Sequence, residues 1–409
     1  MNISTLLLTS QSKLVSSPSN PGTLFTKGTN TDGLMGIGDP VTTNVYTTPQ
    51  LVTLPGLNVG QSVKMVSMGS NSAAAISTDG YMWTWGEARF CSQGYVLTDG
   101  SIKLSSPVRI TQVYNATNNL VPSPLWKYVF AYYSSMFAVD IDGNLYAGGG
   151  ASQITGYGST STRLRKVTLN KTIKKVVASG ATAQSPFAII LTDDGELYSI
   201  GGNNNGQTGL GLFSGTTALY TKIVGGPASW IDIAVNYQTV NAVGAIGADG
   251  KFYTWGHYTG MPPSMGNVSL AVPTLCDQSR VWKSVNGSSV DKGYTGVFYL
   301  ITQDNKLFTC GRQYSAAINS PGFLPALADG TRFEITAVAP SNTFSAAVVN
   351  SQQFYLIDTN SNLWGWGINN NNILGPGSIP IKTPTLINSI DKIYNIDSVN
   401  NRSAFIVSP

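Results

Sequence analysis

The chain contains 409 residues, of which 42% are hydrophobic and only 11% are Asp, Glu, Lys or Arg. The hydrophobic fraction suffices for a large packed core and excludes a disordered chain, whereas the charged fraction is less than half of the roughly 25% found in average proteins. The net charge of +4 comes from 24 basic and 20 acidic residues that form no cluster of Lys and Arg, so we expect no nucleic acid partner.

The first twenty residues contain an apolar run, residues 6–8, that is too short for the core of a signal peptide and has no basic start. We therefore expect no secretory signal, and interpret residues 1–20 as an N-terminal arm or an additional edge strand. No apolar stretch approaches the roughly 18 residues of a membrane span, so no membrane partner is predicted. The expected location is a virion or, failing that, the cytoplasm.

From residue 64 onward, one pattern returns along the chain: an alternating apolar run, a pair such as Asp79-Gly80, a short aromatic run and a closing glycine. Asp-Gly between two alternating runs predicts an antiparallel hairpin with a two-residue type I′ turn, and Asn tolerates the same backbone. An apolar run before each hairpin and a segment after the closing glycine would supply two further strands. The pattern occupies residues 73–86, 137–148, 189–201, 244–256, 299–311 and 355–367.

The spacing of the closing glycines indicates seven units. These glycines stand at positions 28, 86, 148, 201, 256, 311 and 367, between 53 and 62 residues apart. The last unit, beyond Gly367, lacks its turn and aromatic strand, and these stand at residues 21–28 instead. A single sheet of this size cannot bury both faces, so the units must stack. The predicted fold class is all-β: one seven-bladed β-propeller of residues 21–409 with four-stranded blades, the last blade closed by both termini.

Residues 194–211 read Asp-Gly-Glu-Leu-Tyr-Ser-Ile-Gly-Gly-Asn-Asn-Asn-Gly-Gln-Thr-Gly-Leu-Gly, and residues 28–38 and 366–375 are shorter copies. This pattern resembles the repeat of the RCC1 (regulator of chromosome condensation) family, over nearly the whole chain. The resemblance implies an RCC1-like propeller. The founding member of the family is a nucleotide exchange factor for a small GTPase and binds chromatin, and other members inhibit enzymes or scaffold complexes. The wedge and polar residues used for exchange are not matched in this sequence.

Residue types that carry catalysis are scarce. The single histidine, His257, is interpreted as a polar loop residue, and Cys91, Cys276 and Cys310 lack the spacing of metal ligands. Five carboxylates recur at the hairpin turns, where a role in the turn explains them together: Asp79, Asp142, Asp194, Asp249 and Asp304. We therefore expect no enzyme activity, no cofactor and no metal.

Aromatic and methionine residues outside the expected strand positions are candidates for partner binding, because such side chains often anchor protein interfaces. The longest excursion between hairpins, residues 87–124, is the expected place of a partner-specific insertion. The candidates are Phe90, Tyr95, Tyr114, Tyr132, Tyr133, Met136, Tyr237, Tyr258 and Met261. The alternative, that half of these aromatic residues pack between blades, stays open.

Three functional hypotheses follow from these features. Low charge, one histidine and a surface rich in Ser, Thr and Asn favour a non-enzymatic scaffold with other proteins as partners, as a structural protein of a multi-subunit assembly such as a bacteriophage virion (capsid, tail or baseplate). The alternative is a cytosolic regulator of one partner, either a nucleotide exchange factor or an enzyme inhibitor. The third is a carbohydrate-active propeller enzyme, which requires a close carboxylate pair in a central cleft.

Overall fold

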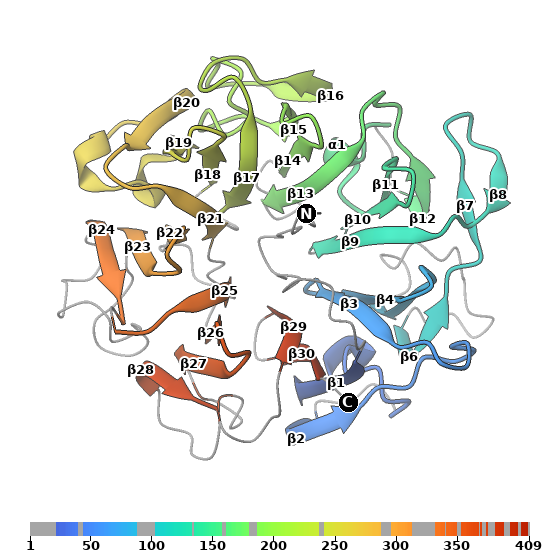
Figure 1. The fold of residues 1–409 in the computed structure, drawn as a ribbon. Helices are drawn as coiled ribbons and strands as arrows, with labels where there is room; N and C mark the ends of the chain where they lie inside the picture. The colour runs from blue at the N-terminus through green and yellow to red at the C-terminus, as the bar shows by residue number, and fades with distance from the viewer. Residues whose placement is uncertain are drawn as a thin grey trace, which may run out of the picture. The chain divides into compact units, whose positions relative to one another are not determined.

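The structure, a computed structural model, describes residues 22–39, 44–87, 103–132, 135–157, 161–179, 186–236, 241–287, 296–312, 332–339, 341–349, 353–367, 369, 374, 381–387, 393–399 and 402–407. These residues contain thirty strands, the short helix α1 (Ser152–Thr155) and three 3-10 turns, η1 (Thr31–Gly33), η2 (Tyr258–Gly260) and η3 (Pro263–Met265) (Figure 1). Residues 1–20, the expected arm, lie outside the described residues.

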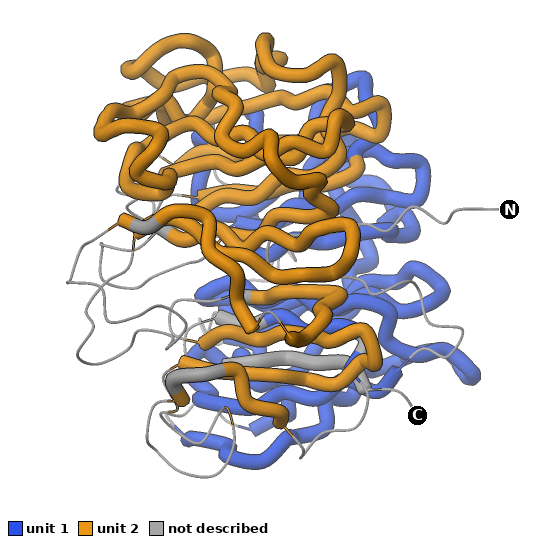
Figure 2. Tube along the Cα trace, turned by 60° about the vertical axis from the view of Figure 1, so that its left-hand side comes forward, with its two compact units in different colours: residues 1–6, 14–173, 391–409 blue, residues 7–13, 174–390 orange. Residues whose placement is uncertain are grey.

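The chain divides into two compact units (Figure 2). Unit 1 takes the described residues up to 173 together with those from 393 onward, and in these residues it contains three sheets. In sheet order their strands are β2 (Val45–Leu51), β1 (Thr23–Thr29), β30 (Arg402–Val407) and β29 (Ile393–Val399); β3 (Val63–Met68), β4 (Ser72–Ser77), β5 (Met82–Glu87) and β6 (Lys103–Arg109); and β8 (Leu120–Pro122), β7 (Gln112–Tyr114), β12 (Ser161–Lys166), β11 (Leu145–Gly149), β10 (Ser135–Asp140) and β9 (Trp126–Tyr132).

Unit 2 takes the described residues from 174 to 387 and contains four sheets there, each with four strands in chain order. Their strands are β13 (Ile173–Ser179), β14 (Phe187–Thr192), β15 (Leu197–Gly202) and β16 (Thr216–Lys222); β17 (Trp230–Val235), β18 (Ala242–Gly247), β19 (Phe252–Gly256) and β20 (Leu270–Asp277); β21 (Trp282–Gly287), β22 (Gly296–Thr302), β23 (Leu307–Arg312) and β24 (Arg332–Val338); and β25 (Phe344–Val349), β26 (Gln353–Asp358), β27 (Leu363–Gly367) and β28 (Ile381–Leu386). Six of the seven described sheets thus have the expected four strands.

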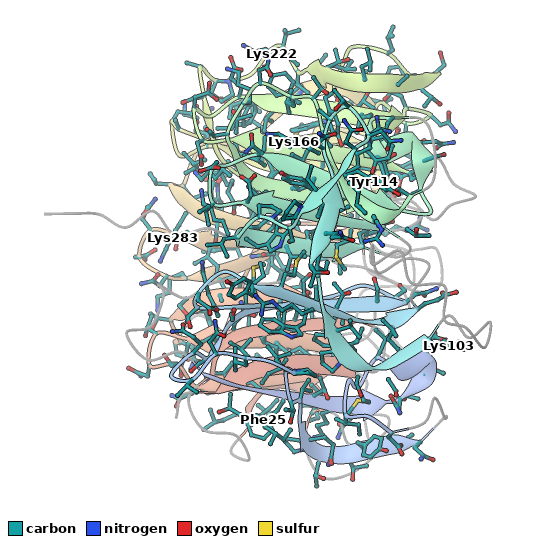
Figure 3. All side chains as sticks on the ribbon, turned by 90° about the vertical axis from the view of Figure 1, so that its right-hand side faces the viewer. Phe25, Lys103, Tyr114, Lys166, Lys222 and Lys283 are labelled. Carbon is teal, nitrogen blue, oxygen red and sulfur yellow. The ribbon has the colours of Figure 1, made fainter. Side chains whose placement is uncertain are left out.

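One sheet of unit 1 has six strands, so the expectation of four was wrong for it. Strands β7 and β8 form a hairpin in which Val113 lies opposite Val121, and β7 joins the edge of β12 with Tyr114 paired in parallel to Arg165. Figure 3 labels Tyr114 on β7 and Lys166 on the neighbouring β12. This hairpin lies inside the excursion of residues 87–124. It adds to the sheet because the edge of β12 offers backbone groups that another strand can pair with.

The first and the last described strands lie side by side in one sheet of unit 1. Strand β1 pairs antiparallel with β30, from Thr23 opposite Val407 to Gly28 opposite Arg402. Strand β30 forms a hairpin with β29, so the sheet takes two strands from each end of the described chain. This pairing covers strand edges that would otherwise be open.

The hairpin turns differ from the two-residue type I′ turn that the Asp-Gly pairs predict. At the first of them, Gly80 N donates to Ser77 O (3.0 Å) and Ser77 N donates to Tyr81 O (2.9 Å), which is the pattern of a type I turn followed by a one-residue bulge. The left-handed φ falls on the second residue of each pair, at 86° for Gly80 and 65° for Asn305. The type I′ prediction was wrong because three residues, not two, connect the paired positions.

The turn also connects each sheet to the next one within a unit. The carbonyl of the bulge residue accepts a hydrogen bond from the residue that opens the next sheet: Gly80 O from Trp126 N at 2.7 Å in unit 1, and Gly250 O from Trp282 N at 2.8 Å in unit 2. A Cβ at Gly250 would lie 2.8 Å from Cγ1 of Val281. Glycine is therefore favoured at this turn position for two reasons: it adopts the left-handed backbone, and it leaves room for the close approach of the next sheet.

The Asn of the best repeat copies has a structural role. The side-chain Oδ1 atoms of Asn30, Asn203 and Asn369 accept hydrogen bonds from N–H groups five residues further on, at 3.2, 3.1 and 2.8 Å, and each residue is at most 2% exposed. In the loop that Asn203 shapes, Gly209 packs against the indole of Trp255, where a Cβ would lie 2.9 Å from Nε1. The motif thus folds a loop that packs against the following sheet.

Candidate functional site

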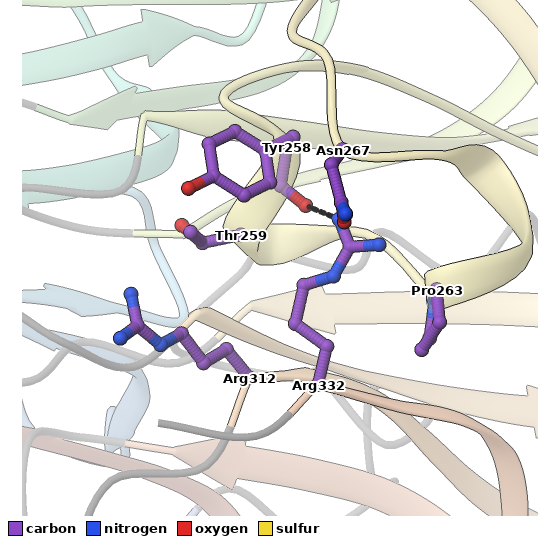
Figure 4. Close-up of a pocket in the computed structure, with 6 residues that line it drawn as sticks. All are labelled: Tyr258, Thr259, Pro263, Asn267, Arg312 and Arg332. Atoms are coloured by element: carbon purple, nitrogen blue, oxygen red, sulfur yellow. Dashed lines mark hydrogen bonds between the residues drawn. The ribbon is translucent and has the colours of Figure 1, made fainter.

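A pocket of about 470 Å³ lies in unit 2, beside the loop that joins β19 to β20 (Figure 4). Four of its lining residues come from this loop, which contains η2 and η3, and two arginines come from β23 and β24 of the next sheet. The lining residues are Tyr258, Thr259, Pro263, Asn267, Arg312 and Arg332.

The η2–η3 loop departs from the Asn-centred loop of the best repeats, because Tyr258 stands at the repeat position that Asn203 holds. His257 organises the loop instead: its Nδ1 caps η2 by accepting from Thr259 N at 3.4 Å, and lies 2.7 Å from Thr259 Oγ1. The rings of His257 and Tyr258 stack with centroids 4.8 Å apart. The interpretation of His257 as a polar loop residue agrees with this capping role.

The two arginines face each other across a pair of strands. Arg312 at the end of β23 lies directly opposite Arg332 at the start of β24. Nη1 of Arg332 donates to the carbonyls of Tyr258 (2.7 Å) and Gly266 (2.8 Å), so this side chain ties the strand to two points of the η2–η3 loop. Its guanidinium carbon lies 5.4 Å from the centroid of the Tyr258 ring, within the range of a cation–π contact.

Burial and charge determine the protonation states at the pocket. Burial lowers the pKa of His257, and the charge of Arg312 lowers it further, so the imidazole is neutral at pH 7. Burial also lowers the pKa of Arg332, although an arginine stays charged in proteins. None of the six lining residues that the structure describes is a carboxylate. Glu334 lies nearby on β24, where its two oxygens accept from the N and Oγ of Ser264 at 2.8 Å each.

The structure separates the predicted partner-binding residues. Tyr258 lines the pocket, and Tyr114 is half-buried on β7. Met136 and Met261 are fully buried and Tyr132 is 6% exposed, so these three side chains pack in the interior and are not available to a partner. Placing Tyr132 and Met136 outside strands was wrong, because Tyr132 is the last residue of β9 and Met136 is the second residue of β10. The remaining candidates, Phe90, Tyr95, Tyr133 and Tyr237, lie outside the described residues.

Both pocket arginines were missed by reasoning from the sequence. Arg312 follows a closing glycine, at the same repeat position as His257, and the repeat register could have indicated that the two lie at corresponding ends of their strands. Arg332 carries no such signal. It stands twenty residues further on, and only the pairing of β24 with β23 brings it to the pocket.

Four of the five turn carboxylates accept hydrogen bonds within their own hairpins, which agrees with the turn role predicted for them: Asp79, Asp194, Asp249 and Asp304. Asp79 Oδ1 accepts from Ser77 Oγ at 2.5 Å, Thr192 makes the same bond to Asp194, and Asp249 accepts from the hydroxyl of Tyr253. In the hairpin of Asp142 the accepting carboxylate is that of Asp140, which takes the backbone N–H groups of Asp142 and Asn144. Within the described ranges, His, Cys, Asp and Glu side chains form no group of three that could hold a metal ion. The helices found in those ranges are too short or too polar to cross a membrane.

Comparison with known proteins extends the resemblance beyond the motif. Residues 185–207 match the Regulator of chromosome condensation (RCC1) repeat family. The RCC1-like G exchanging factor-like protein of Homo sapiens is 27% identical over 198 residues, which cover 47% of this chain and 41% of that protein. The Ultraviolet-B receptor UVR8 of Arabidopsis thaliana is 27% identical over 185 residues, covering 45% and 38%. The matched segments span less than half the length of either relative.

Solved structures match over nearly the whole chain. Human WBSCR16 has a TM-score of 0.74 at 16% identity, covering 95% of this chain and 100% of that one. Yeast RCC1 (Prp20), solved bound to Kap60, also gives 0.74 at 16% identity, covering 100% and 94%. The chain has an RCC1-like β-propeller fold. Its sheets are therefore propeller blades, and the expected resemblance to the RCC1-like family is confirmed.

Identification of the RCC1-like blades places the pocket within the repeat. The closing glycine stands at the end of the third strand or one residue before it, and the residue after it is His257 in one blade and Arg312 in the next. The pocket thus forms where the loop after one third strand meets the third and fourth strands of the following blade. Loops at strand ends are where folds of this kind vary without a change in the core.

Proposed function

We propose that this chain is a non-enzymatic, protein-binding regulator that acts on one partner. The observation that supports this most directly is the similarity to an RCC1-like G exchanging factor-like protein and to a receptor, over 45–47% of the chain. Proteins of the same fold have been studied in complexes: yeast RCC1 with Kap60, and Prp20p of Saccharomyces cerevisiae for its binding to Gsp1p and histones. The names of these proteins describe binding and exchange, in keeping with a non-enzymatic role.

This proposal replaces the virion hypothesis that the composition favoured. None of the relatives named above is a virion component, and the findings fit the alternative of a regulator better. The composition gave the wrong hypothesis because a low fraction of charged residues characterises only the surface of a protein. Structural proteins of assemblies and regulators can have the same kind of surface, so it does not distinguish these functions. A cytoplasmic location remains part of the proposal.

We also propose that residues 21–409 form a single seven-bladed propeller closed by both termini, with residues 1–20 as an arm or an edge strand. Two features support closure: the described residues contain seven sheets, and β1 pairs with β30 over six residues. Closure by strands from both ends stabilises a propeller because it removes open edges.

The proposed function is tested by recovering the partner from native cells. The chain is tagged, crosslinked in the cell and purified, and the bound proteins are identified and quantified by mass spectrometry. A regulator should carry one partner in equimolar amount. If that partner is a small GTPase, release of labelled GDP in the presence of the chain tests exchange directly. Recovery of many copies of capsid or tail proteins, or of no partner, would overturn the proposal.

A further inference from the structure

The fourth strands of the blades differ in how their outer edges are protected. Each fourth strand pairs with the third strand of its blade through a bulge, and in four of the seven described blades the last residue of this bulge is a proline. These prolines are Pro49, Pro107, Pro273 and Pro384. A proline has no N–H to donate, so it hinders the pairing of a further strand with the edge at this point.

Strand β12 lacks this proline, and its edge is covered. Leu164 ends its bulge, and the next residue, Arg165, pairs in parallel with Tyr114 of β7. The bulge itself therefore does not prevent a further strand from pairing. The covering hairpin is uncharged, because residues 110–125 contain no Asp, Glu, Lys or Arg. In this blade the chain covers a proline-free edge with an uncharged strand of its own.

Strand β16 also lacks the proline, because Tyr220 ends its bulge, and no strand among the described residues pairs with its outer edge. The chain on both sides of β16, residues 186–236, is described throughout. A Cβ added to Gly215 before the strand or to Gly225 after it would meet no described atom within 4 Å. The remaining proline-free strand, β24, adjoins residues 313–331, which lie outside the described residues. Within the described structure, β16 is therefore an edge open to pairing.

The surface around β16 is apolar and nearly uncharged. Leu212, Phe213, Leu219 and Val224 are 62%, 52%, 70% and 68% exposed. The only charged residue between positions 197 and 229 is Lys222, labelled in Figure 3, and it pairs with Glu196. Exposed apolar side chains beside an open edge are typical of a surface that another chain covers. A charged strand would lose hydration there without meeting an opposite charge, so an uncharged occupant is favoured.

We propose that β16 binds an extended, uncharged segment of the partner protein, which pairs with its outer edge as β7 pairs with β12. The proposal rests on the protein-binding function proposed above and assigns one surface and the chemistry of its occupant. Backbone hydrogen bonds hold such a segment, and the exposed Leu219 offers an apolar contact. A second copy of this chain is disfavoured, because two copies joined through the same edge about a twofold axis run antiparallel, whereas β7 runs parallel to β12.

The test uses a strand of known pairing as its probe. The peptide Ile-Thr-Gln-Val-Tyr-Asn-Ala, residues 110–116, contains β7, and it is amidated and labelled with a fluorophore at its N-terminus. Its binding to the full chain is followed by fluorescence anisotropy. Two further peptides carry N-methyl groups on alternate residues, one on each of the two possible sets. A strand pairs with an edge through alternate residues, so one methylated peptide should lose binding and the other should keep it.

Substitutions locate the edge. Tyr220→Pro should weaken binding about ten-fold or more, because it removes an edge N–H and leaves an acceptor of the peptide unpaired. Tyr220→Ala is the matched control: it removes the side chain and its contacts, keeps the N–H, and should change binding less than about three-fold. Should Tyr220→Pro not fold, the two methylated peptides on the unaltered chain still decide. Equal losses in the two variants, equal responses to the two methylated peptides, or no binding at about 1 mM peptide would overturn the proposal.

Other outcomes separate this proposal from self-association and from the proposed function. A concentration-dependent dimer in sedimentation velocity that Tyr220→Pro abolishes would identify a second copy as the occupant and refute a partner segment. A partner that copurifies equally with Tyr220→Pro and Tyr220→Ala would refute the edge contact while the protein-binding function stands. The absence of any partner in native cells would refute the proposed function, whereas the peptide titration reports on β16 alone.

Discussion

Lys175 and Asp232 form an ion pair in the interior of unit 2, with 2.6 Å between Lys175 Nζ and Asp232 Oδ1 and with side chains that are 1% and 2% exposed. The second oxygen of Asp232, Oδ2, accepts a hydrogen bond from Val285 N at 2.9 Å. One carboxylate thus links the first strands of three successive blades, β13, β17 and β21. In unit 1, Asp397 makes a related link from β29 to Met68 N of β3, at 2.8 Å.

Removing one partner of the buried pair should destabilise the protein strongly. Lys175→Met leaves the Asp232 carboxylate buried without a cation, and we expect the free energy of unfolding to fall by about 3–5 kcal/mol. Urea denaturation measures this, with Lys222→Met as the matched control: Lys222 pairs with Glu196 at the surface, and its loss should cost less than about 1 kcal/mol. Equal losses in the two variants would contradict the role of the buried pair. Lys175→Met with Asp232→Leu should recover only part of the loss, because it removes the buried charge but leaves Val285 N without its acceptor.

The Asn of the repeat should be required for local folding rather than for binding. Asn203→Ala removes the acceptor of Thr208 N and the donor to Leu212 O, and leaves a buried N–H unsatisfied. The free energy of unfolding should fall by about 2 kcal/mol or more. Asn205→Ala in the same loop is the control, because Asn205 uses its backbone N–H, which survives the substitution, to bond Gln207. A loss no larger than in this control would show that the loop folds without the Asn side chain.

The single histidine should titrate below its ordinary pKa of 6.5. Burial disfavours its charged form and Arg312 repels it, so Arg312→Gln should raise the pKa but leave it below 6.5, since burial is the larger cause. The pKa of His257 is therefore higher in the unfolded chain than in the folded chain, so the unfolded chain keeps the imidazole proton up to a higher pH. Stability from this group is therefore complete above about pH 6.5 and is lost as the pH falls through the lower, folded pKa.

NMR of the His257 ring gives the pKa, and urea denaturation between pH 5 and 7 gives the stability. His257→Asn should flatten the decline in stability over this range. A pKa at or above 6.5 in the folded protein would contradict both the burial of the ring and its proximity to Arg312.

The described thiols should be unreactive in the folded protein. Burial raises the pKa of Cys276 to about 12, with Asp277 and Glu334 adding to the effect, and burial raises the pKa of Cys310 well above its ordinary value. Because the thiolate is the reactive form, iodoacetamide at pH 8 should modify both at least about a hundred-fold more slowly than in the unfolded chain. Peptide mass spectrometry with and without urea measures the rates. Rapid native modification of Cys276 would be inconsistent with its burial.

Much of the fold could be predicted from local sequence. Alternating apolar runs around Asp79-Gly80 and its equivalents specify hairpins because period-2 alternation and a turn residue act over a few neighbouring positions. The RCC1-like repeat was recognisable for the same reason, since Asn203 and its counterparts bond to residues only five positions away. The turn type was predicted wrongly because a dipeptide does not reveal how many residues its flanking strands leave unpaired.

The sequence by itself determined the repeated units, their hairpins and the all-β class, because these depend on interactions within about fifteen residues. Only the tertiary structure decided which residues meet between blades. Lys175 reaches Asp232 across 57 positions, and Arg332 reaches the loop of Tyr258 across 74. Such contacts depend on how the blades stack and on strand register, which no local pattern encodes. The candidate site belongs to this second class: Tyr258 could be named in advance, but the two arginines that give the pocket its charge could not.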